Sequence, residues 1–188
     1  GLTGVEVVTR CEVTSVNFQA KTVTALCQGQ TWLESYDKLV IATGATPFVP
    51  QVEGIRLPGV FTMRTPDDAI ALRSYVQDRH CRSAVVVGAG FIGLEIAENL
   101  QAQGLAVTVI DAADQILPKI FDPEMAGYAR RRLRQNGIRV LTGTPLSEIT
   151  GTERADGVLA GGSRIGADLV VLAIGIRPAT TFLNGSGL

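Results

Sequence analysis

Hydrophobic and polar positions follow two different rhythms along the chain. From Cys11 to Phe18 and from Lys21 to Leu26, apolar and polar residues alternate, which predicts antiparallel strands. The run from Lys38 to Gly44 is mostly apolar and predicts a strand that ends at a glycine. The prolines that follow, Pro47, Pro50 and Pro58, indicate a connector.

A capped helix and then a strand–helix–strand pattern come next. Thr65 and Pro66 mark the start of a helix that we expect to run to about Gln77. The later apolar runs predict strands at 84–87, 106–110, 138–141 and 169–174, with helices at 91–103 and 122–136 between them and a small antiparallel meander around 149–165. The fold class predicted is α/β, a Rossmann-like doubly wound parallel sheet with a β meander, preceded by a β-rich segment.

An internal repeat organises these elements. Asp37–Pro47 matches Asp168–Pro178, and in both copies a glycine follows the aspartate by 7 residues and a proline follows it by 10. The second copy closes the α/β domain that begins near Ser83, so we expect the first copy to close another domain of that kind. Only 36 residues precede the first copy, and they hold no glycine-rich turn like the one at residues 88–93. We therefore expect the chain to be a fragment that lacks the front of a first such domain.

Composition narrows the possible functions. The net charge of −1 argues against a nucleic-acid partner, and no apolar run approaches the roughly 20 residues of a membrane span. The three cysteines, Cys11, Cys27 and Cys81, show neither a CxxC spacing nor a metal-binding pattern. We interpret them as free thiols of a cytoplasmic protein, and we expect no metal site.

The residues Gly88, Ala89, Gly90, Phe91, Ile92 and Gly93 form a GxGxxG turn between a predicted strand and a predicted helix. Gly88 permits the tight turn, Gly90 lets the backbone approach a pyrophosphate, and Gly93 lets the helix pack closely on the strand. The phosphates would then lie at the helix N-terminus, where unpaired N–H groups favour an anion. The motif in this setting predicts a dinucleotide site.

An acidic residue indicates which dinucleotide the site prefers. Asp111 follows Gly88 by 23 residues and ends the second predicted strand, where a carboxylate can accept hydrogen bonds from the ribose hydroxyls of adenosine. It would repel the 2′-phosphate of NADP, and Ala112 and Ala113 offer no cation to bind that phosphate. We therefore expect NAD in preference to NADP. Glu95 has two interpretations, a favourable charge near a helix N-terminus or a contact near the nicotinamide end.

With these motifs, the sequence resembles the pyridine nucleotide-disulfide oxidoreductases, particularly NADH oxidases, NADH peroxidases and coenzyme A-disulfide reductases. The stretches that carry the resemblance are Tyr36–Pro47, Val60–Thr65, Val87–Ala97, Asp114–Pro118 and Ala173–Pro178. The resemblance implies an FAD domain that is split in sequence by an NAD domain. Residues 1–80 would be the remnant of the first FAD-domain segment, residues 81–175 the NAD domain, and residues 176–188 the start of the second FAD-domain segment.

The resemblance also implies roles for individual residues. Phe91 and Ile92 would line the nicotinamide pocket, and Phe91 would act as a gate over the flavin. Glu95 would contact the nicotinamide or a lysine beside the flavin, and the backbone of Gly175 would approach the NAD. The residues expected near FAD in the full parent are Ala42, Thr43, Gly44 and Arg64.

The implied reaction passes a hydride from NADH to FAD and then on to a disulfide, a peroxide or oxygen. The redox-active cysteine and the C-terminal domain through which the parent would form a homodimer lie outside the chain, so we expect no catalytic residue here and no turnover by the chain alone. Its ligand would be a small molecule, with no nucleic acid or membrane involved. Two alternatives stay open: a ferredoxin or rubredoxin reductase parent, and a stand-alone NAD-sensing module.

Overall fold

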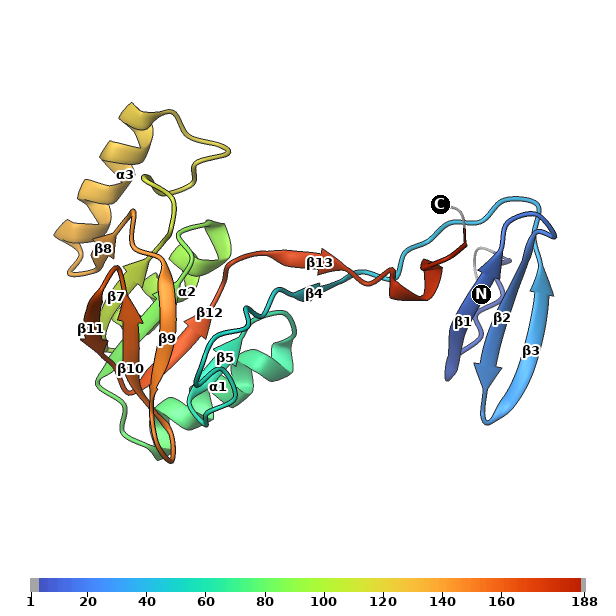
Figure 1. Cartoon of the computed structure of the whole chain (residues 1–188), viewed down its shortest axis with the longest axis horizontal. Coiled ribbons are helices and arrows are strands. Elements are labelled where there is room, and N and C mark those ends of the chain that lie inside the picture. Colours follow the sequence, from blue (N-terminus) through green and yellow to red (C-terminus); the bar gives the residue numbers. More distant parts are fainter. Residues whose placement is uncertain (1–3, 187–188) are drawn as a thin grey trace. The chain divides into compact units, whose positions relative to one another are not determined.

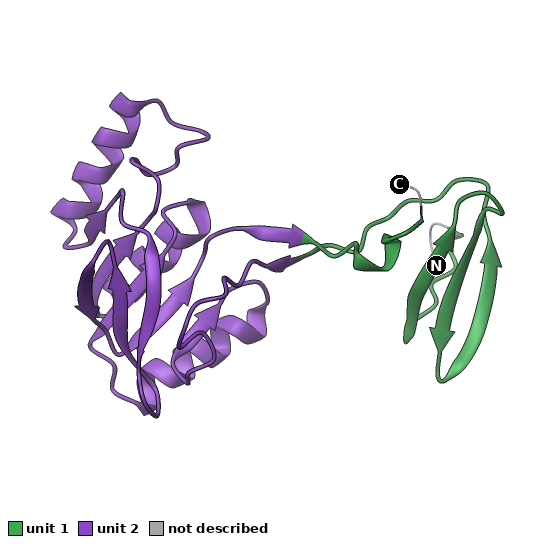
Figure 2. Cartoon of the chain, in the orientation of Figure 1, with its two compact units in different colours: residues 1–45, 178–188 green, residues 46–177 purple. Residues whose placement is uncertain are grey.

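The computed structural model describes residues 4–186, which belong to two compact units (Figure 2). Unit 1 contains the chain up to Ala45 and again from Pro178 onward, and unit 2 contains Thr46–Arg177. The chain therefore passes between the units twice. Both passages lie in short strands, β4 (Ala45–Pro47) and β13 (Ile176–Pro178), which pair with each other.

Unit 1 is built on a three-stranded antiparallel sheet in the order β1–β2–β3. Its strands are β1 (Cys11–Asn17), β2 (Thr22–Cys27) and β3 (Gln30–Ser35), and a short 3₁₀ helix, η1 (Thr181–Leu183), follows in the C-terminal segment (Figure 1). The alternation that predicted β1 and β2 is confirmed, while β3 was not predicted. Of the described residues of this sheet, only Val16 and Ala25 are buried. Unit 1 therefore has a very small core of its own.

The expectation of three free thiols is wrong for two of them. Cys11 and Cys27 are partners in the ladder between β1 and β2, and a disulfide joins them. Their Cα atoms are 4.2 Å apart although 16 positions separate them in sequence. Spacing along the chain could not show this pairing, because it depends on the register of two strands. Only Cys81 is free among the described residues, so the cysteines do not indicate a cytoplasmic location.

The prediction of an apolar strand at residues 38–44 is also wrong. These residues form neither a helix nor a strand, and Val40 is 85% exposed. The second copy of the repeat does form a strand, β12 (Leu169–Leu172), which is buried between two neighbouring strands. An apolar run becomes a strand only where other strands satisfy its backbone N–H and C=O groups, and within residues 4–186 no strand lies beside residues 38–44.

Unit 2 contains a five-stranded parallel sheet in the order β5–β12–β6–β7–β8. Helices α1, α2 and α3 and an antiparallel meander complete the unit, as Figure 1 shows. The elements are β5 (Val60–Thr62), α1 (Pro66–Asp78), β6 (Ser83–Val87), α2 (Phe91–Ala102), β7 (Ala106–Ile110), α3 (Pro123–Gln135), β8 (Arg139–Leu141), β9 (Leu146–Gly151), β10 (Ala155–Ala160) and β11 (Ser163–Gly166). The predicted α/β fold class is confirmed, since a parallel sheet, helices and an antiparallel meander are all present.

The parallel sheet separates two apolar cores. Alternate residues of β6 point to opposite faces, so Ala84 and Val86 pack against the helices while Val85 and Val87 pack against the meander. All four side chains are almost completely buried. This burial on both faces is typical of parallel strands and explains the continuous apolar runs in the sequence. Because β6 pairs in parallel with both β7 and β12, the carboxyl ends of these three strands lie together at one edge of the sheet.

Helix α1 begins with a complete capping box. The Thr65 hydroxyl accepts a hydrogen bond from Asp68 N, and the Asp68 carboxylate accepts one from Thr65 N. Strand β5, just before this helix, pairs with β12. The first compact unit ends at Ala45 and the second begins at Thr46. The domain boundary expected near residue 80 concerns the full parent and stays a prediction.

Asp168 fixes the start of β12 to the start of β6. One carboxylate oxygen accepts hydrogen bonds from Arg82 N at 2.8 Å and from Ser83 N and Oγ, both at 2.9 Å. Burial alone would raise the pKa of this carboxyl, but these hydrogen bonds outweigh it and hold the pKa below its usual value. The aspartate of the repeat therefore sets the register of the central strands.

We predict that reduction of the Cys11–Cys27 disulfide destabilises β1 and β2. The loop that it closes is of a size for which the bond contributes about 3 kcal/mol, and the sheet has little buried apolar area to compensate. Hydrogen exchange of the β1 and β2 amides should therefore accelerate in a dithiol reductant. A Cys11→Ser/Cys27→Ser variant should exchange fast with or without reductant. Equal protection of the unmodified chain in both conditions would contradict the prediction.

Candidate functional site

The predicted glycine-rich turn lies at the carboxyl end of β6 and leads directly into α2. Gly90 is the N-cap residue of this helix, in an extended conformation, and no side chain caps the helix. The first N–H groups of α2 therefore have no side-chain acceptor. The positive end of the helix dipole lies at the same place, so this terminus favours an anion.

The three glycines of the turn have different surroundings. A Cβ atom on Gly93 would overlap the carbonyl oxygen of Gly88, so only glycine lets α2 pack this closely on the strand end. Gly88 itself has a φ of +109°, and a Cβ there would overlap the backbone of Ala173, the residue just after β12. A Cβ on Gly90 would meet no protein atom within 4 Å. Gly90 is thus the glycine with open space beside it, where a ligand can approach the backbone.

That open space belongs to a cavity of about 710 Å³, which we call the glycine-turn cavity. Of the residues predicted to bind NAD, its walls include Gly88, Gly90, Phe91, Ile92, Asp111 and Gly175. Ala89 and Gly93 are not among the lining residues and lie buried behind the turn. The fold therefore brings together residues from the ends of three parallel strands, β6, β7 and β12. Crevices at the carboxyl ends of such strands are the usual place for ligands in open α/β sheets.

Asp111 is held firmly at the edge of this cavity. One carboxylate oxygen accepts a hydrogen bond from Ala89 N at 2.6 Å, and the other accepts one from Ala113 N at 2.8 Å. Each oxygen has a further lone pair for an external donor. The side chain thus fixes the middle of the glycine turn and also presents an acceptor at the end of β7, as a ribose diol requires.

The two copies of the repeat are linked by reciprocal backbone hydrogen bonds. Gly175 accepts one from Phe48 N, four residues after Gly44, and Gly44 accepts one from Ala179 N, four residues after Gly175; both are 2.9 Å long. The two glycines have φ values of +117° and +71° respectively. The Arg177 guanidinium also stacks 4.4 Å from the centre of the Phe48 ring. These contacts hold the backbone of Gly175 at the wall of the cavity.

The residues expected near FAD lie in both units. Ala42, Thr43 and Gly44 belong to unit 1, where the Thr43 hydroxyl donates to Ala179 O at 2.8 Å. Arg64 belongs to unit 2 and follows β5. Their role toward a flavin stays a prediction.

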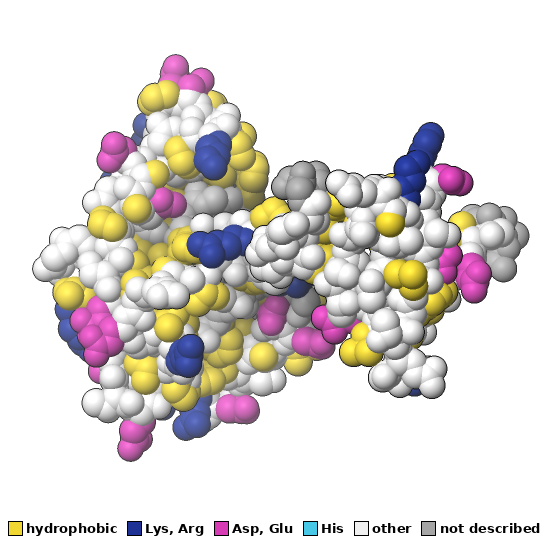
Figure 3. Space-filling model, turned by 45° about the vertical axis from the view of Figure 1, so that its right-hand side comes forward, with side chains coloured by type: hydrophobic (Ala, Val, Ile, Leu, Met, Phe, Trp, Pro, Cys, Tyr) yellow, Lys and Arg dark blue, Asp and Glu magenta, His cyan; other side chains and the backbone are white. Residues whose placement is uncertain are grey.

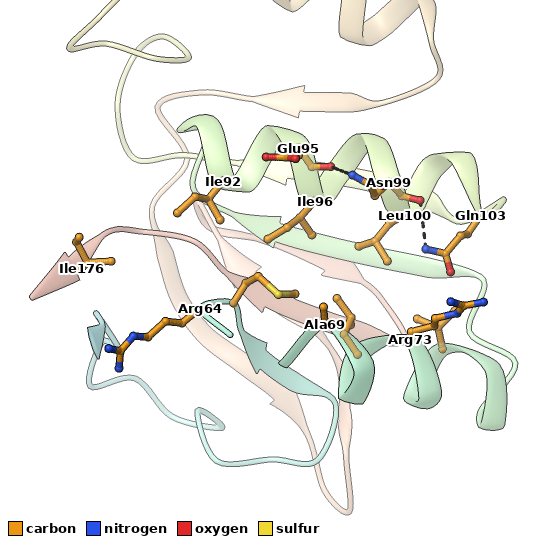
Figure 4. Close-up of a pocket in the computed structure, with 13 residues that line it drawn as sticks. Arg64, Ala69, Arg73, Ile92, Glu95, Ile96, Asn99, Leu100, Gln103 and Ile176 are labelled. Atoms are coloured by element: carbon orange, nitrogen blue, oxygen red, sulfur yellow. Dashed lines mark hydrogen bonds between the residues drawn. The ribbon is translucent and has the colours of Figure 1, made fainter. Parts of the chain in front are cut away.

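Glu95 does not line the glycine-turn cavity. It lines an adjoining groove of about 580 Å³ between α1 and α2, together with Arg64 (Figure 4). Apolar side chains of both helices form much of this groove, and Ile92 lines both it and the cavity. The groove continues along α2 past Asn99, whose amide donates to the Glu95 carbonyl at 2.8 Å. Contact between the Glu95 side chain and a nicotinamide stays a prediction.

One part of the cavity wall was missed by the sequence reasoning. The loop between β7 and α3 contributes Leu117, Pro118, Lys119 and Ile120. In the sequence, the stretch Asp114–Pro118 contributes only to the family resemblance. A loop of this kind carries no periodic signal, and its position depends on how it folds back on the glycine turn.

Other sites are not apparent in the described chain. Between residues 4 and 186 no cluster of three or more His, Cys, Asp or Glu side chains could hold a metal ion. None of the helices described is long and apolar enough to cross a membrane. Hydrophobic side chains reach the surface among scattered charges, as in most globular proteins (Figure 3).

Comparison with known proteins agrees with this geometry. Residues 2–188 match the pyridine nucleotide-disulphide oxidoreductase family. The chain belongs to this family. An NADH oxidase of Methanocaldococcus jannaschii is 39% identical over 179 residues, which cover 94% of this chain and 40% of that protein. A CoA-dependent NAD(P)H sulfur oxidoreductase of Pyrococcus furiosus is 41% identical over 143 residues, covering 76% of this chain and 32% of that protein.

Solved structures of similar proteins share this fold. An NAD-dependent persulfide reductase from A. fulgidus superposes with a TM-score of 0.90 at 36% identity, over 100% of this chain and 35% of that one. A ferredoxin reductase from Rhodopseudomonas palustris gives a TM-score of 0.87 at 32% identity, over 98% of this chain and 45% of that one. The chain thus spans less than half the length of these relatives.

Two substitutions should separate the roles of the glycines. Gly90→Ala places a methyl group in the open space of the cavity, so we expect unchanged thermal stability and about tenfold weaker dinucleotide binding. Gly93→Ala forces α2 away from Gly88, so we expect a lower melting temperature as well as weak binding. Circular dichroism melting and calorimetric titration would measure the two properties. Gly90→Ala with undiminished binding would count against the cavity as the dinucleotide site.

Proposed function

We propose that this chain is the NAD(H)-binding part of a flavoprotein oxidoreductase, in which a hydride from NADH passes to FAD and then on to a disulfide, a peroxide or oxygen. The observation that carries the proposal is the glycine-turn cavity, which unites the turn, Asp111 and Gly175. Membership of an oxidoreductase family supports the redox chemistry. Bound NADH supplies the hydride, while this chain supplies binding and orientation.

The proposed placement of the dinucleotide follows from the chemistry of the cavity walls. The backbone at Gly90 and the N-terminus of α2 would receive the pyrophosphate, since they offer unpaired N–H groups and room. Asp111 would accept hydrogen bonds from the ribose of adenosine. Phe91 and Ile92 are 59% and 49% exposed and could cover an aromatic ring such as nicotinamide with apolar surface. Gly175 would approach the ligand through its backbone.

We further propose that NAD is preferred over NADP. A fixed carboxylate at the ribose position favours two hydroxyls and repels a 2′-phosphate. Neither Ala112 nor Ala113 can offset this repulsion. Relatives differ in this respect, since the Methanocaldococcus jannaschii protein is named for NADH and the Pyrococcus furiosus protein for NAD(P)H.

The remaining expectations concern the parent protein. FAD would bind to a domain to which unit 1 contributes, and the terminal acceptor would be chosen by residues outside this chain. The isolated chain would therefore not turn over. The parent would be a homodimer, and we keep a cytoplasmic location as a proposal although the Cys11–Cys27 disulfide removes the support from cysteine usage. A ferredoxin reductase parent has structural support in the Rhodopseudomonas palustris enzyme. A stand-alone NAD sensor is not favoured, because a sensor would not need unit 1 as a segment of a flavin domain.

Binding of NADH by the chain itself tests the proposed function. We expect calorimetric titration to show one site that saturates at or below millimolar NADH, and we expect the purified chain to retain little flavin absorbance. ADP-ribose should compete, since it shares the pyrophosphate and both riboses. Absence of any heat of binding at millimolar NADH, in a chain shown to be folded by circular dichroism, would overturn the proposal.

The preference for NAD should depend on Asp111. In Asp111→Ala, both affinities should fall because Ala89 N loses its acceptor, but the affinity for NADPH relative to NADH should rise about tenfold as the repulsion disappears. Asp114→Ala is the matched control, because Asp114 is exposed and outside the cavity walls. An unchanged ratio of the two affinities in Asp111→Ala would refute this role.

A further inference from the structure

The loop between β7 and α3 is fastened to the glycine turn. Leu117 N donates to Ala89 O at 3.1 Å, so Asp111 and Leu117 between them engage both backbone groups of Ala89. Leu117 is 5% exposed and has a φ of +49°, a left-handed conformation that is costly for a leucine. Such strain persists only where the surroundings determine the conformation. The loop is therefore a built part of the cavity wall.

Residues 117–121 form a tight turn at this point. The carbonyl oxygen of Leu117 accepts hydrogen bonds from Ile120 N and Phe121 N, both at 3.0 Å. The Gln115 amide closes the loop further by donating to Phe121 O at 2.9 Å. The backbone of Lys119 lies inside this turn. Its position is thus set by at least four hydrogen bonds of its neighbours, while its side chain is exposed.

Lys119 has a distinctive charge environment. Among the described residues that line the cavity, it is the only cation, and Asp111 is the only anion. The single ion pair found between residues 4 and 186 joins Asp156 to Arg164, on two strands of the meander. Within that range, Lys119 therefore forms no ion pair with a carboxylate. Both oxygens of Asp111 are turned to backbone N–H groups instead. The ammonium group is consequently available to an anionic ligand.

We propose that Lys119 binds a phosphate group of the dinucleotide in the glycine-turn cavity, a contact that rests on the proposed function of this cavity. A lysine ammonium on a flexible stem binds phosphate as a point charge. Two phosphate sources share this chemistry, the pyrophosphate present in both NADH and NADPH and the 2′-phosphate present only in NADPH. In the second case Lys119 offsets part of the repulsion from Asp111, and the site accepts NADPH as a weaker second ligand.

Four forms of the chain test this proposal: the unmodified chain, Lys119→Met, Lys119→Arg and Arg130→Met. The methionine keeps the apolar stem and removes the charge. Arg130 is exposed on α3 and outside the cavity walls, so its variant is a matched control for the loss of one positive charge. Calorimetric titration with NADH and with NADPH gives two dissociation constants for each form. Thermal melting confirms that each form is folded.

We expect Lys119→Met to weaken binding about tenfold, the effect of one charge-assisted hydrogen bond, while Lys119→Arg and Arg130→Met bind normally. Weaker binding of both NADH and NADPH identifies the pyrophosphate as the partner of Lys119. Weaker binding of NADPH alone identifies the 2′-phosphate. Either result supports the proposal. It is overturned if Lys119→Met binds both ligands like the unmodified chain, or if Arg130→Met weakens binding equally. Failure of the unmodified chain to bind NADH would instead overturn the proposed function, and this contact with it.

Discussion

The close contact between the first turn of α2 and the end of β6 is the constraint on which the rest of the site depends. Gly93 lies against the carbonyl of Gly88, and no side chain fits between them. This contact points the N-terminus of α2 at the carboxyl edge of the sheet. The edge can then serve as an anion site only because the glycines leave its backbone accessible.

Ala89 shows how the surrounding segments stabilise that turn. Its N–H and C=O groups are both hydrogen-bonded, the first to the Asp111 carboxylate and the second by Leu117 N. Asp111 therefore has a structural role in addition to the proposed contact with ribose. Because Asp111 has both roles, it couples the shape of the proposed phosphate site to the end of β7. A change in the backbone at one of these places would therefore alter the position of the other.

The two copies of the internal repeat make similar hydrogen bonds but differ in secondary structure. The aspartate at 168 sets the start of β12 against β6, and the glycines at 44 and 175 accept hydrogen bonds from the segments that follow the opposite copy. One of these two equivalent hydrogen bonds lies within unit 2 and the other within unit 1. The same sequence pattern nevertheless gives a buried strand in one copy and an irregular segment in the other, because only β12 has strands on both sides.

Much of the site could be predicted from local patterns. The glycine spacing, the capped helix starts and the acidic residue after the second strand have short-range physical causes, so the sequence alone indicated the turn, α2 and Asp111. The tertiary structure alone decided which distant residues meet. It paired Cys11 with Cys27, left residues 38–44 without a strand partner, put Glu95 in the neighbouring groove and brought Lys119 to the cavity wall. These outcomes depend on strand register, on neighbouring strands and on the path of a loop, which are interactions between segments far apart in sequence.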